Sequence, residues 1–347
     1  MDLMTYAEQL RFGELHIVHD EKTGLKGIVA LHNLKLGPAI GGCRCIPYPS
    51  SDAAMRDVMR LARGMTYKAA ISKLPHGGGK SVIMRPAHLT ADGPERQAFF
   101  EAFGDFIDSL GGKYLVAEDS GTSIGDMDII RSRTRHVLGS GAADASGDPS
   151  PFTAYGVRRG IEAAVHFRYK RDDMEGLTVA VQGLGNVGYH LARELHELGA
   201  KLIVTDVRTE AIERAVAEFG ATAVGIDEIY GVEADIFAPC ALGAVINDDT
   251  IKQLKVDIVA GASNNQLAED RHGLELKERG ILYAPDYALN AGGLINVASE
   301  FEGYNVEKSR KLTTAIYDTM LGIFDRAMGE DAPTNEIADR IVEEIIY

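Results

Sequence analysis

The sequence has few cysteines, few basic residues and no long apolar run. Only three of its 347 residues are cysteine, too few for a fold built on disulfides. Lysine and arginine number 36 against 51 aspartates and glutamates, and the net charge of −15 argues against nucleic acid or an anionic membrane as a partner. No apolar stretch approaches the roughly 18 residues of a membrane-spanning helix. We therefore expect a globular protein that binds neither nucleic acid nor membrane.

The cysteines and the N-terminus indicate the compartment. An odd and small number of cysteines suits a reducing cytosol, and the first residues lack the basic and apolar regions of a signal peptide. We therefore predict a cytoplasmic protein. Cys43 and Cys45 could be half of a metal site, but zinc needs further ligands and none with suitable spacing are evident. No metal is expected, and these thiols are interpreted as small buried side chains.

Length and pattern predict two α/β domains. A segment rich in glycine, alanine, serine and proline at residues 139–151 is typical of a connector. After it, strands and helices alternate, which predicts a parallel sheet with helices on both faces. Strands are expected at 25–30, 81–84, 114–117, 177–181, 202–204, 235–238, 257–260 and 282–284, a turn-rich segment at 37–42, and helices from about 52 and at 93–110, 153–167, 186–198 and 307–347. The last helical segment is expected to close back across the first domain.

The segment Leu177–Asp206 carries the pattern of a dinucleotide site. A strand is followed by Gly183, Gly185 and Gly188 in G-x-G-x-x-G spacing, then by a helix, a second strand and Asp206. The glycines permit a tight turn, close approach of a pyrophosphate to the helix N-terminus, and close packing of helix on strand. Asp206 can accept hydrogen bonds from the ribose hydroxyls of NAD and would repel the extra phosphate of NADP. An ordinary βαβ unit with chance glycines is the alternative, and the complete set of features disfavours it.

Two lysines lie in glycine-rich surroundings. Lys80 follows Gly77–Gly79, and Lys68 ends the preceding helical stretch. GGGKS suggests the phosphate-binding loop of a phosphotransferase, but Leu74 stands where that motif needs glycine. The glycines instead let backbone pack beside Lys80 and exclude water, and a lysine desolvated near a second cation can serve as a general acid and base at neutral pH. On charge statistics alone, two solvated surface lysines are the favoured alternative.

Nine stretches along almost the whole chain resemble the leucine, phenylalanine and valine dehydrogenases, which are related to glutamate dehydrogenase. They are LGPAIGGCR (36–44), RLARGMTYKAA (60–70), GGGKSVI (77–83), AEDSGTS (117–123), GDPSPFTAYGV (147–157), VAVQGLGNVGYHL (179–191), IFAPCALG (236–243), NNQL (264–267) and YAPDYALNAGGLINVA (283–298). The resemblance implies an N-terminal α/β substrate domain and a doubly wound Rossmann domain for NAD, with the active-site cleft between them. The expected limits are 1–138, completed by a C-terminal helix at about 326–347, and 139–325.

The implied reaction is reversible oxidative deamination of an L-amino acid to its 2-oxo acid and ammonia. By resemblance, Lys80 is the acid and base that activates water, Asp119 handles the proton of the amino group, and Lys68 binds the substrate carboxylate. These residue types suit the chemistry, because a cationic imine needs an anion nearby and the carboxylate needs a fixed cation. Without the resemblance, Asp119 could equally be a helix cap, and Asn264 and Asn265 could be turn residues.

The resemblance also assigns the binding residues. Substrate contacts are expected from Gly41, Gly42, Asn265 and Asn290, and the side-chain pocket from Ile40, Ala117, Leu294 and Val297. Cofactor contacts are expected from Gly183, Gly185, Asn186, Val187, Gly188, Asp206, Ala238, Pro239, Cys240 and Ala241.

The pocket positions predict the amino acid. All four are apolar, so glutamate is not expected, because its buried γ-carboxylate would lack a cation. Ala117 resembles the leucine enzymes, whereas Leu294 is more typical of the phenylalanine enzymes. We predict leucine, isoleucine and valine as substrates, with a phenylalanine-preferring enzyme or a catalytically silent NAD-binding regulatory protein as alternatives. The short C-terminal tail favours a homodimer, with an octamer as the other assembly that the resemblance allows.

Overall fold

The computed structural model describes residues 2–87, 89, 93–142 and 145–347, which form two compact units. Unit 1 comprises Met1–Asp148, Val297–Asn305 and Ile345–Tyr347, and unit 2 comprises Pro149–Asn296 and Val306–Glu344. Residues 143–144 of the expected connector lie outside the described residues.

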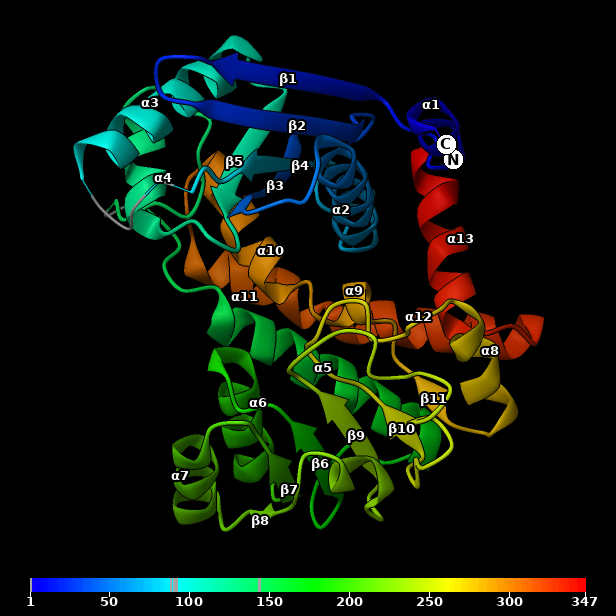
Figure 1. The fold of residues 1–347 in the computed structure, drawn as a ribbon. Coiled ribbons are helices and arrows are strands. Elements are labelled where there is room, and N and C mark those ends of the chain that lie inside the picture. Colours follow the sequence, from blue (N-terminus) through cyan, green and yellow to red (C-terminus); the bar gives the residue numbers. More distant parts are fainter. Residues whose placement is uncertain (1, 88, 90–92, 143–144) are drawn as a thin grey trace. The chain divides into compact units, whose positions relative to one another are not determined.

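Unit 1 is built on a mixed sheet with strand order β1–β2–β4–β3–β5 (Figure 1). Strands β1, β2 and β4 pair antiparallel, whereas β3 runs parallel to both β4 and β5. The register pairs Cys43 with Ser81 and Gly42 with Ala117, so Gly42, Lys80 and Ala117 lie at the same level of three adjacent strands. The strands are β1 (Glu14–Asp20), β2 (Leu25–Asn33), β3 (Ala39–Ile46), β4 (Gly77–Met84) and β5 (Tyr114–Glu118).

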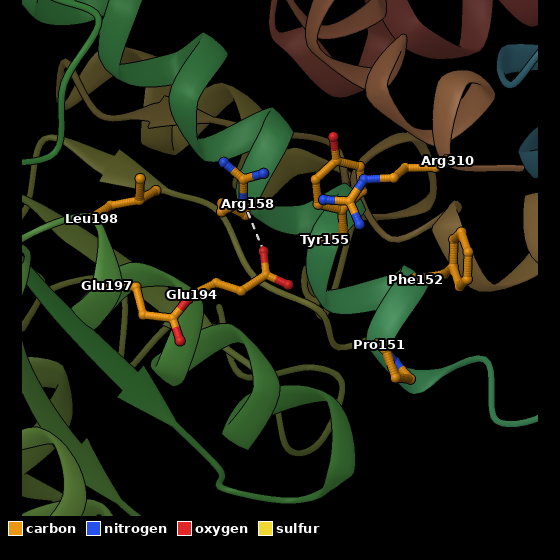
Figure 2. Close-up of a pocket in the computed structure, with 8 residues that line it drawn as sticks. All are labelled: Pro151, Phe152, Tyr155, Arg158, Glu194, Glu197, Leu198 and Arg310. Atoms are coloured by element: carbon orange, nitrogen blue, oxygen red, sulfur yellow. Dashed lines mark hydrogen bonds and ion pairs between the residues drawn. The ribbon is translucent and has the colours of Figure 1, made fainter. Parts of the chain in front are cut away.

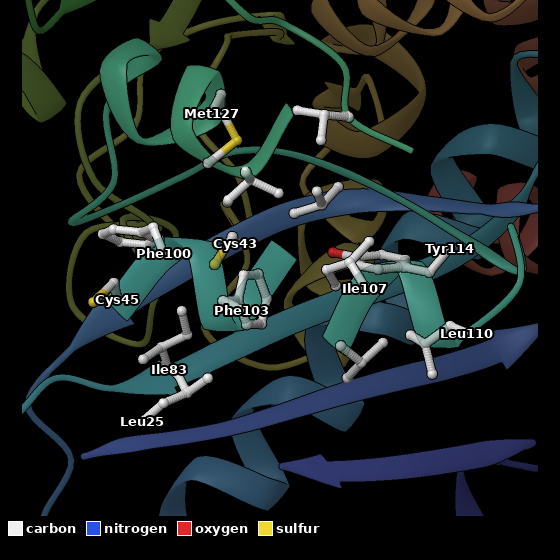
Figure 3. Packing of buried hydrophobic residues seen from close by; sticks show 14 of the residues in the cluster. Leu25, Cys43, Cys45, Ile83, Phe100, Phe103, Ile107, Leu110, Tyr114 and Met127 are labelled. Carbon is white, nitrogen blue, oxygen red and sulfur yellow. The ribbon is translucent and has the colours of Figure 1, made fainter. Parts of the chain in front are cut away.

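Helices cover both faces of this sheet. The helices of unit 1 are α1 (Leu3–Gln9), α2 (Ser51–Ile71), α3 (Pro94–Ser109) and α4 (Ile124–Arg131). Helix α2 begins after Ser50, whose hydroxyl accepts a hydrogen bond from Ala53 N at 3.1 Å, and it buries Val58 and Ala62 against Val82 of β4. On the other face, α3 and α4 pack phenylalanines and aliphatic side chains onto the strands (Figure 3).

The thiols of Cys43 and Cys45 lie in the hydrophobic cluster that α3 and α4 form with the sheet (Figure 3). Burial raises the pKa of the Cys45 thiol to about 11, and it raises the pKa of the Cys43 thiol further. Both side chains are therefore neutral core residues, which confirms the interpretation made from the sequence.

Unit 2 is built on a parallel sheet with strand order β11–β10–β9–β6–β7–β8 (Figure 1). The chain runs outward from β6 to β8, returns to β9 beside β6, and runs outward again to β11. This is the doubly wound order, and its direction reverses between β6 and β9, where such sheets bind ligands beyond the carboxyl ends of the strands. The strands are β6 (Thr178–Gln182), β7 (Lys201–Thr205), β8 (Thr222–Ala223), β9 (Ile236–Pro239), β10 (Ile258–Val259) and β11 (Leu282–Tyr283).

The remaining helices follow the strands of unit 2 and end the chain. Helix α12 packs on α5, which groups most of the C-terminal segment with unit 2. Among the described residues, no helix combines the length and apolarity that crossing a bilayer requires. The helices are α5 (Ser150–Tyr169), α6 (Asn186–Glu197), α7 (Thr209–Phe219), α8 (Arg271–Glu278), α9 (Asp286–Leu289), α10 (Gly292–Ala298), α11 (Val306–Thr314), α12 (Ile316–Glu330) and α13 (Thr334–Ile346), with short 3₁₀ turns at Glu228–Gly231 and Ser299–Glu302.

The predicted α/β fold with a doubly wound second half is confirmed, and one local prediction is wrong. Residues 39–42, expected in a turn, belong to β3, which pairs with a strand on each side. Strand β4 begins at Gly77 rather than at the predicted Ser81, because Gly77 and Gly78 pair in register with Ala39 and Ile40 of β3. The edge strand β1 was not predicted, because its side chains are half-buried or exposed and give no long apolar run.

The units differ from the expected domain limits of 1–138 and 139–325. Residues 139–148 group with unit 1, because the Glu300 carboxylate accepts hydrogen bonds from Gly139 N at 3.0 Å and Ser146 N at 2.6 Å. The expected helix at about 326–347 groups with unit 2 as far as Glu344, and only Ile345–Tyr347 group with unit 1. The domain limits stay a prediction.

Candidate functional site

Gly77–Gly79 lie inside strand β4, where neighbouring backbone leaves no room for a side chain. A Cβ on Gly77 would lie 2.1 Å from Asn33 O, and one on Gly78 would lie 1.9 Å from Thr66 N. A phosphate-binding loop has to connect a strand to a helix N-terminus, so the phosphotransferase alternative is excluded. The prediction that these glycines pack backbone closely beside Lys80 is confirmed.

Lys80 forms an enclosed ion pair with Asp119. Lys80 is 8% exposed, and its Nζ contacts Asp119 Oδ2. Asp119 follows β5 directly, and its other oxygen, Oδ1, accepts a hydrogen bond from Ser120 N at 2.6 Å. Thr122 Oγ1 accepts a further bond from Asp119 N at 3.0 Å. These loop contacts fix the carboxylate with Oδ2 toward Lys80, so the interpretation of Lys80 as a solvated surface lysine is excluded.

The Asp119 carboxylate is held in its charged form. Burial alone would raise the pKa of this carboxyl, but Lys80, the Ser120 amide and Arg44 together hold it below its ordinary value. A carboxylate and an amine in contact and shielded from water can stabilise a cationic substrate and exchange protons with it.

Gly41 and Gly42 give the pair its space. A Cβ on Gly42 would lie 2.7 Å from Asp119 Cβ and 3.0 Å from Lys80 Nζ, and a Cβ on Gly41 would lie 1.8 Å from Gly79 O. The Tyr114 hydroxyl, on β5, donates a hydrogen bond to Gly41 O at 2.7 Å. Unit 1 therefore brings Gly42, Lys80 and Asp119 together, as the family resemblance implied.

Sequence reasoning missed Arg44, a second cation beside this pair. Its Nε lies 3.7 Å from Asp119 Oδ2, and its Nη1 donates a hydrogen bond to Asp57 Oδ2 at 2.9 Å. Side chains alternate along a strand, so positions 42 and 44 of β3 point to the same face. An arginine two residues after Gly42 in a buried strand was the signal that could have identified it.

The other predicted substrate residues of unit 1 lie on α2, β3, β5 and α10. Lys68 is half-buried in the last turn of α2. Ile40 is buried in β3, and Ala117, which pairs with Gly42 in register, is half-buried in β5. Val297 lies on α10 and groups with unit 1, whereas Leu294, on the same helix, groups with unit 2.

The glycine loop of unit 2 lies at the point where the strand order reverses. Gly183 has φ of +96°, and a Cβ there would lie 2.7 Å from Ala241 Cβ. A Cβ on Gly188 would lie 2.0 Å from Gly183 O and 3.1 Å from Cys240 Cβ. The loop after β6 therefore packs directly against the end of β9, which carries the predicted cofactor residues Ala238 to Ala241.

The N-terminus of α6 is open beside this loop. Gly185 is the N-cap of α6 and offers no side-chain hydrogen bond, and a Cβ placed on it meets nothing within 4 Å. Asn186, exposed, and Val187, half-buried, form the first turn. An uncapped helix N-terminus with free space in front of it suits a phosphate group.

Asp206 ends this βαβ unit and holds the loop. Its Oδ2 accepts a hydrogen bond from Leu184 N at 2.6 Å, and its Oδ1 accepts from Arg208 N at 2.8 Å. Burial alone would raise the pKa of the Asp206 carboxyl, but these N–H groups and the Arg208 side chain hold it below its ordinary value. The carboxylate is charged. Oδ1 accepts a second hydrogen bond from Arg208 Nε at 3.2 Å, whereas Oδ2 keeps a lone pair for a ligand hydroxyl.

A cavity of about 520 Å³ opens beside the glycine loop, and two predicted cofactor residues, Gly185 and Asn186, line it. Its basic side chains suit an anionic ligand. The lining residues are Leu184, Gly185, Asn186, Tyr189, His190, Arg193, Arg208, Glu210, Ala211 and Arg214.

Another pocket of unit 2, of about 390 Å³, contains no predicted site residue (Figure 2). It lies between α5, α6 and α11, where Arg158 Nε donates a hydrogen bond to Glu194 Oε2 at 2.7 Å. The guanidinium groups of Arg158 and Arg310 lie 4.8 and 4.7 Å from the centre of the Tyr155 ring. These side chains hold one another, and we assign them no part in the reaction.

Asn265 and Asn290 have different surroundings in unit 2. Asn265 is exposed and has φ of +52°, a turn conformation that asparagine adopts readily. Asn290 is 4% exposed, and its Nδ2 donates hydrogen bonds to Ala262 O at 3.0 Å and Asn264 Oδ1 at 2.9 Å. Its Oδ1 is buried and accepts no hydrogen bond from the described residues.

Comparison with known proteins gives the family. Residues 11–136 match the Glu/Leu/Phe/Val dehydrogenase dimerisation domain, and residues 146–214 and 204–336 match Glutamate/Leucine/Phenylalanine/Valine dehydrogenase. The leucine dehydrogenases of Geobacillus stearothermophilus and Bacillus subtilis (strain 168) are 52% and 50% identical to this chain, and each alignment covers 100% of this chain and 94% of the relative. Among solved structures, L-tryptophan dehydrogenase from Nostoc punctiforme is 42% identical, with a TM-score of 0.88 over 99% of this chain and 98% of that one.

The family matches cover most of the chain, and these curated relatives match it from end to end. The chain belongs to the Glu/Leu/Phe/Val dehydrogenase family.

Proposed function

We propose that this protein catalyses the reversible NAD-dependent oxidative deamination of leucine, isoleucine and valine to their 2-oxo acids and ammonia. The observation that carries the proposal is the enclosed Lys80–Asp119 pair beside Gly42. The leucine dehydrogenase relatives support the same reaction.

Lys80 and Asp119 carry the proton transfers in this proposal. Lys80 Nζ takes a proton from the water that attacks the imino carbon of the substrate and returns it when ammonia leaves. Asp119 accepts a proton from the substrate amino group and releases it to solvent, so that it is anionic again when it stabilises the cationic imine. The contact between Lys80 Nζ and Asp119 Oδ2 lets a proton pass between them.

The glycine loop would hold NAD. Gly185 and the first turn of α6 leave space for the pyrophosphate, and Asp206 Oδ2 offers an acceptor for a ribose hydroxyl. Asn290 Oδ1, buried and without a donor among the described residues, suits the carboxamide of the nicotinamide or the substrate amino group. When bound, NAD supplies the oxidant that takes hydride from the substrate α-carbon, so no metal is proposed.

A direct assay tests this proposal. Leucine and NAD should give NADH, ammonia and the 2-oxo acid in equal amounts. An NAD-binding protein that oxidises no amino acid would favour the alternative of a silent regulatory protein instead.

The preference among amino acids is proposed from the pocket residues Ile40, Ala117, Leu294 and Val297. Their side chains are apolar and of moderate size, which favours aliphatic substrates. Phenylalanine preference is the second candidate, and the tryptophan dehydrogenase relative makes an aromatic substrate worth testing. The ratio of kcat/KM for leucine to that for phenylalanine separates the two.

Replacing Lys68 with alanine should raise KM for leucine by about 10- to 100-fold and change kcat less, because a charged hydrogen bond to the substrate carboxylate is lost. Steady-state kinetics measure both constants. The matched control is Lys73→Ala, an exposed lysine just after α2, which should leave KM unchanged. An unaltered KM in the Lys68 variant would remove this residue from the carboxylate role.

Replacing Asp206 with asparagine should lower the preference for NAD over NADP by about tenfold. The substitution removes the charge that repels the 2′-phosphate and weakens the hold on Arg208. The control is Glu210→Gln, an exposed acid that lines the cavity beside the glycine loop, which should keep the wild-type ratio. An equal ratio of kcat/KM values in wild type and Asp206→Asn would mean that another residue recognises the ribose.

The assembly and compartment are also proposals. Residues 11–136 match a dimerisation domain, so we propose a homo-oligomer, with a dimer favoured and an octamer possible. Light scattering distinguishes the two. The free cysteines are consistent with our proposal that the protein works in the cytoplasm.

A further inference from the structure

We propose that Arg44 is a positioning residue that shares the charge of Asp119 and thereby lets Lys80 release its proton. The inference rests on the proposed function, in which Lys80 must be neutral when it activates water.

The geometry directs Arg44 at the catalytic pair. The β3–β5 register pairs Cys43 with Glu118, so Arg44 is level with Asp119. Arg44 Nε is buried, has no hydrogen-bond acceptor among the described residues, and lies 3.7 Å from Asp119 Oδ2, the same oxygen that contacts Lys80 Nζ. This carboxylate oxygen therefore has two cations beside it.

Asp57 of α2 holds the guanidinium at this distance. Its Oδ2 accepts hydrogen bonds from Arg44 Nη1 at 2.9 Å and from the Tyr48 hydroxyl at 2.7 Å, and its Oδ1 accepts from Arg60 Nη2 at 3.0 Å. Burial would raise the pKa of the Asp57 carboxyl, but these donors hold it below its ordinary value. Asp57 is thus a charged anchor that keeps Arg44 beside Asp119 without closing a direct hydrogen bond.

This arrangement matters at the moment when Lys80 is neutral. If Lys80 were the only cation beside Asp119, its deprotonation would leave an enclosed carboxylate without a counter-charge, which is costly. Arg44 remains charged at every working pH and keeps Asp119 compensated.

The other titratable groups around the pair do not replace Arg44. Burial raises the pKa values of Cys43 and Tyr114, which are neutral. The pKa of the Tyr48 hydroxyl is raised by burial and by Asp57, so it is neutral as well. Burial and the neighbouring Asp126, Asp148 and Asp119 raise the pKa of Glu118, on β5. Lys68 of α2 is also a cation of the proposed site, but it is present in every variant below and therefore cannot cause a difference between them.

The test is the pH profile of kcat/KM for leucine with NAD. In Arg44→Gln, the pH at which kcat/KM reaches half of its maximum should move up by about 0.5–1 unit. The negative charge of Asp119 is then balanced by Lys80 alone and no longer shared with Arg44. Asp57→Asn removes a negative charge beside Arg44 and should lower the pH at which kcat/KM reaches half of its maximum. Arg44→Lys keeps the charge and should restore part of the wild-type profile. Arg60→Gln, which removes another donor to Asp57, should leave the profile in place.

Opposite shifts in Arg44→Gln and Asp57→Asn would not follow from a merely structural disturbance. A profile of Arg44→Gln that coincides with wild type, or an equal upward shift in Arg60→Gln, would overturn the proposal. If Arg44→Gln fails to fold, the downward shift of Asp57→Asn decides, and its absence counts against Arg44. An inactive wild-type protein would instead refute the proposed function.

Discussion

Replacing Lys80 with alanine is expected to lower kcat for leucine by at least about 10³-fold while NAD still binds. The substitution removes the group that activates water in the proposed mechanism. Arg44, 3.7 Å away, still compensates the carboxylate, so the variant should fold. Single-turnover kinetics and a fluorescence titration with NADH measure the two effects separately.

A matched control for this variant is Lys113→Ala. Lys113 is exposed just before β5, pairs with Glu14 at 3.0 Å, and should tolerate the change with wild-type kinetics. Near-normal turnover in Lys80→Ala would refute the acid–base assignment. Lost NADH binding in the same variant would mean that the substitution had damaged more than the catalytic step.

Replacing Gly188 with alanine should abolish NAD binding, the second large effect. The new Cβ would lie 2.0 Å from Gly183 O, so α6 has to move away from the loop that the cofactor needs. Gly185→Ala should act differently, because its Cβ meets no protein atom within 4 Å and can collide only with the bound pyrophosphate. We expect Gly185→Ala to weaken NADH binding without lowering Tm, whereas Gly188→Ala should lower both.

The control for the glycine variants is Gly322→Ala, in the middle of α12. A Cβ there also meets nothing within 4 Å, and alanine is the better helix former, so Tm should rise slightly and NADH binding should not change. If Gly185→Ala binds NADH as tightly as wild type does, the pyrophosphate does not lie against this loop.

The predicted site residues of unit 1 and those of unit 2 differ in how far the sequence predicts their surroundings. The glycine loop is a local pattern, because strand, turn, helix and Asp206 follow one another within one βαβ unit. The sequence therefore predicts both the fold of unit 2 and the surroundings of Gly183 and Gly188. In unit 1, Gly42, Lys80 and Asp119 meet through the register of three strands, and only the family resemblance predicts their meeting.

Two features of unit 1 could not be predicted from local patterns. Gly41 and Gly42 suggest a turn, but their lack of side chains serves the close approach of Gly79 O and Asp119 inside a paired strand. The contact of Arg44 with Asp57 joins a strand to a helix, and its geometry depends on how α2 packs on the sheet. Such contacts follow from tertiary packing rather than from propensity or spacing.

The most direct test of the account is NADH production at alkaline pH by the purified protein with a panel of L-amino acids and with NAD or NADP. The account predicts that NAD is required and that leucine, valine or isoleucine gives the highest kcat/KM. The highest value for phenylalanine or tryptophan would keep the mechanism and contradict the interpretation of the pocket. No NADH from any amino acid would contradict the central claim.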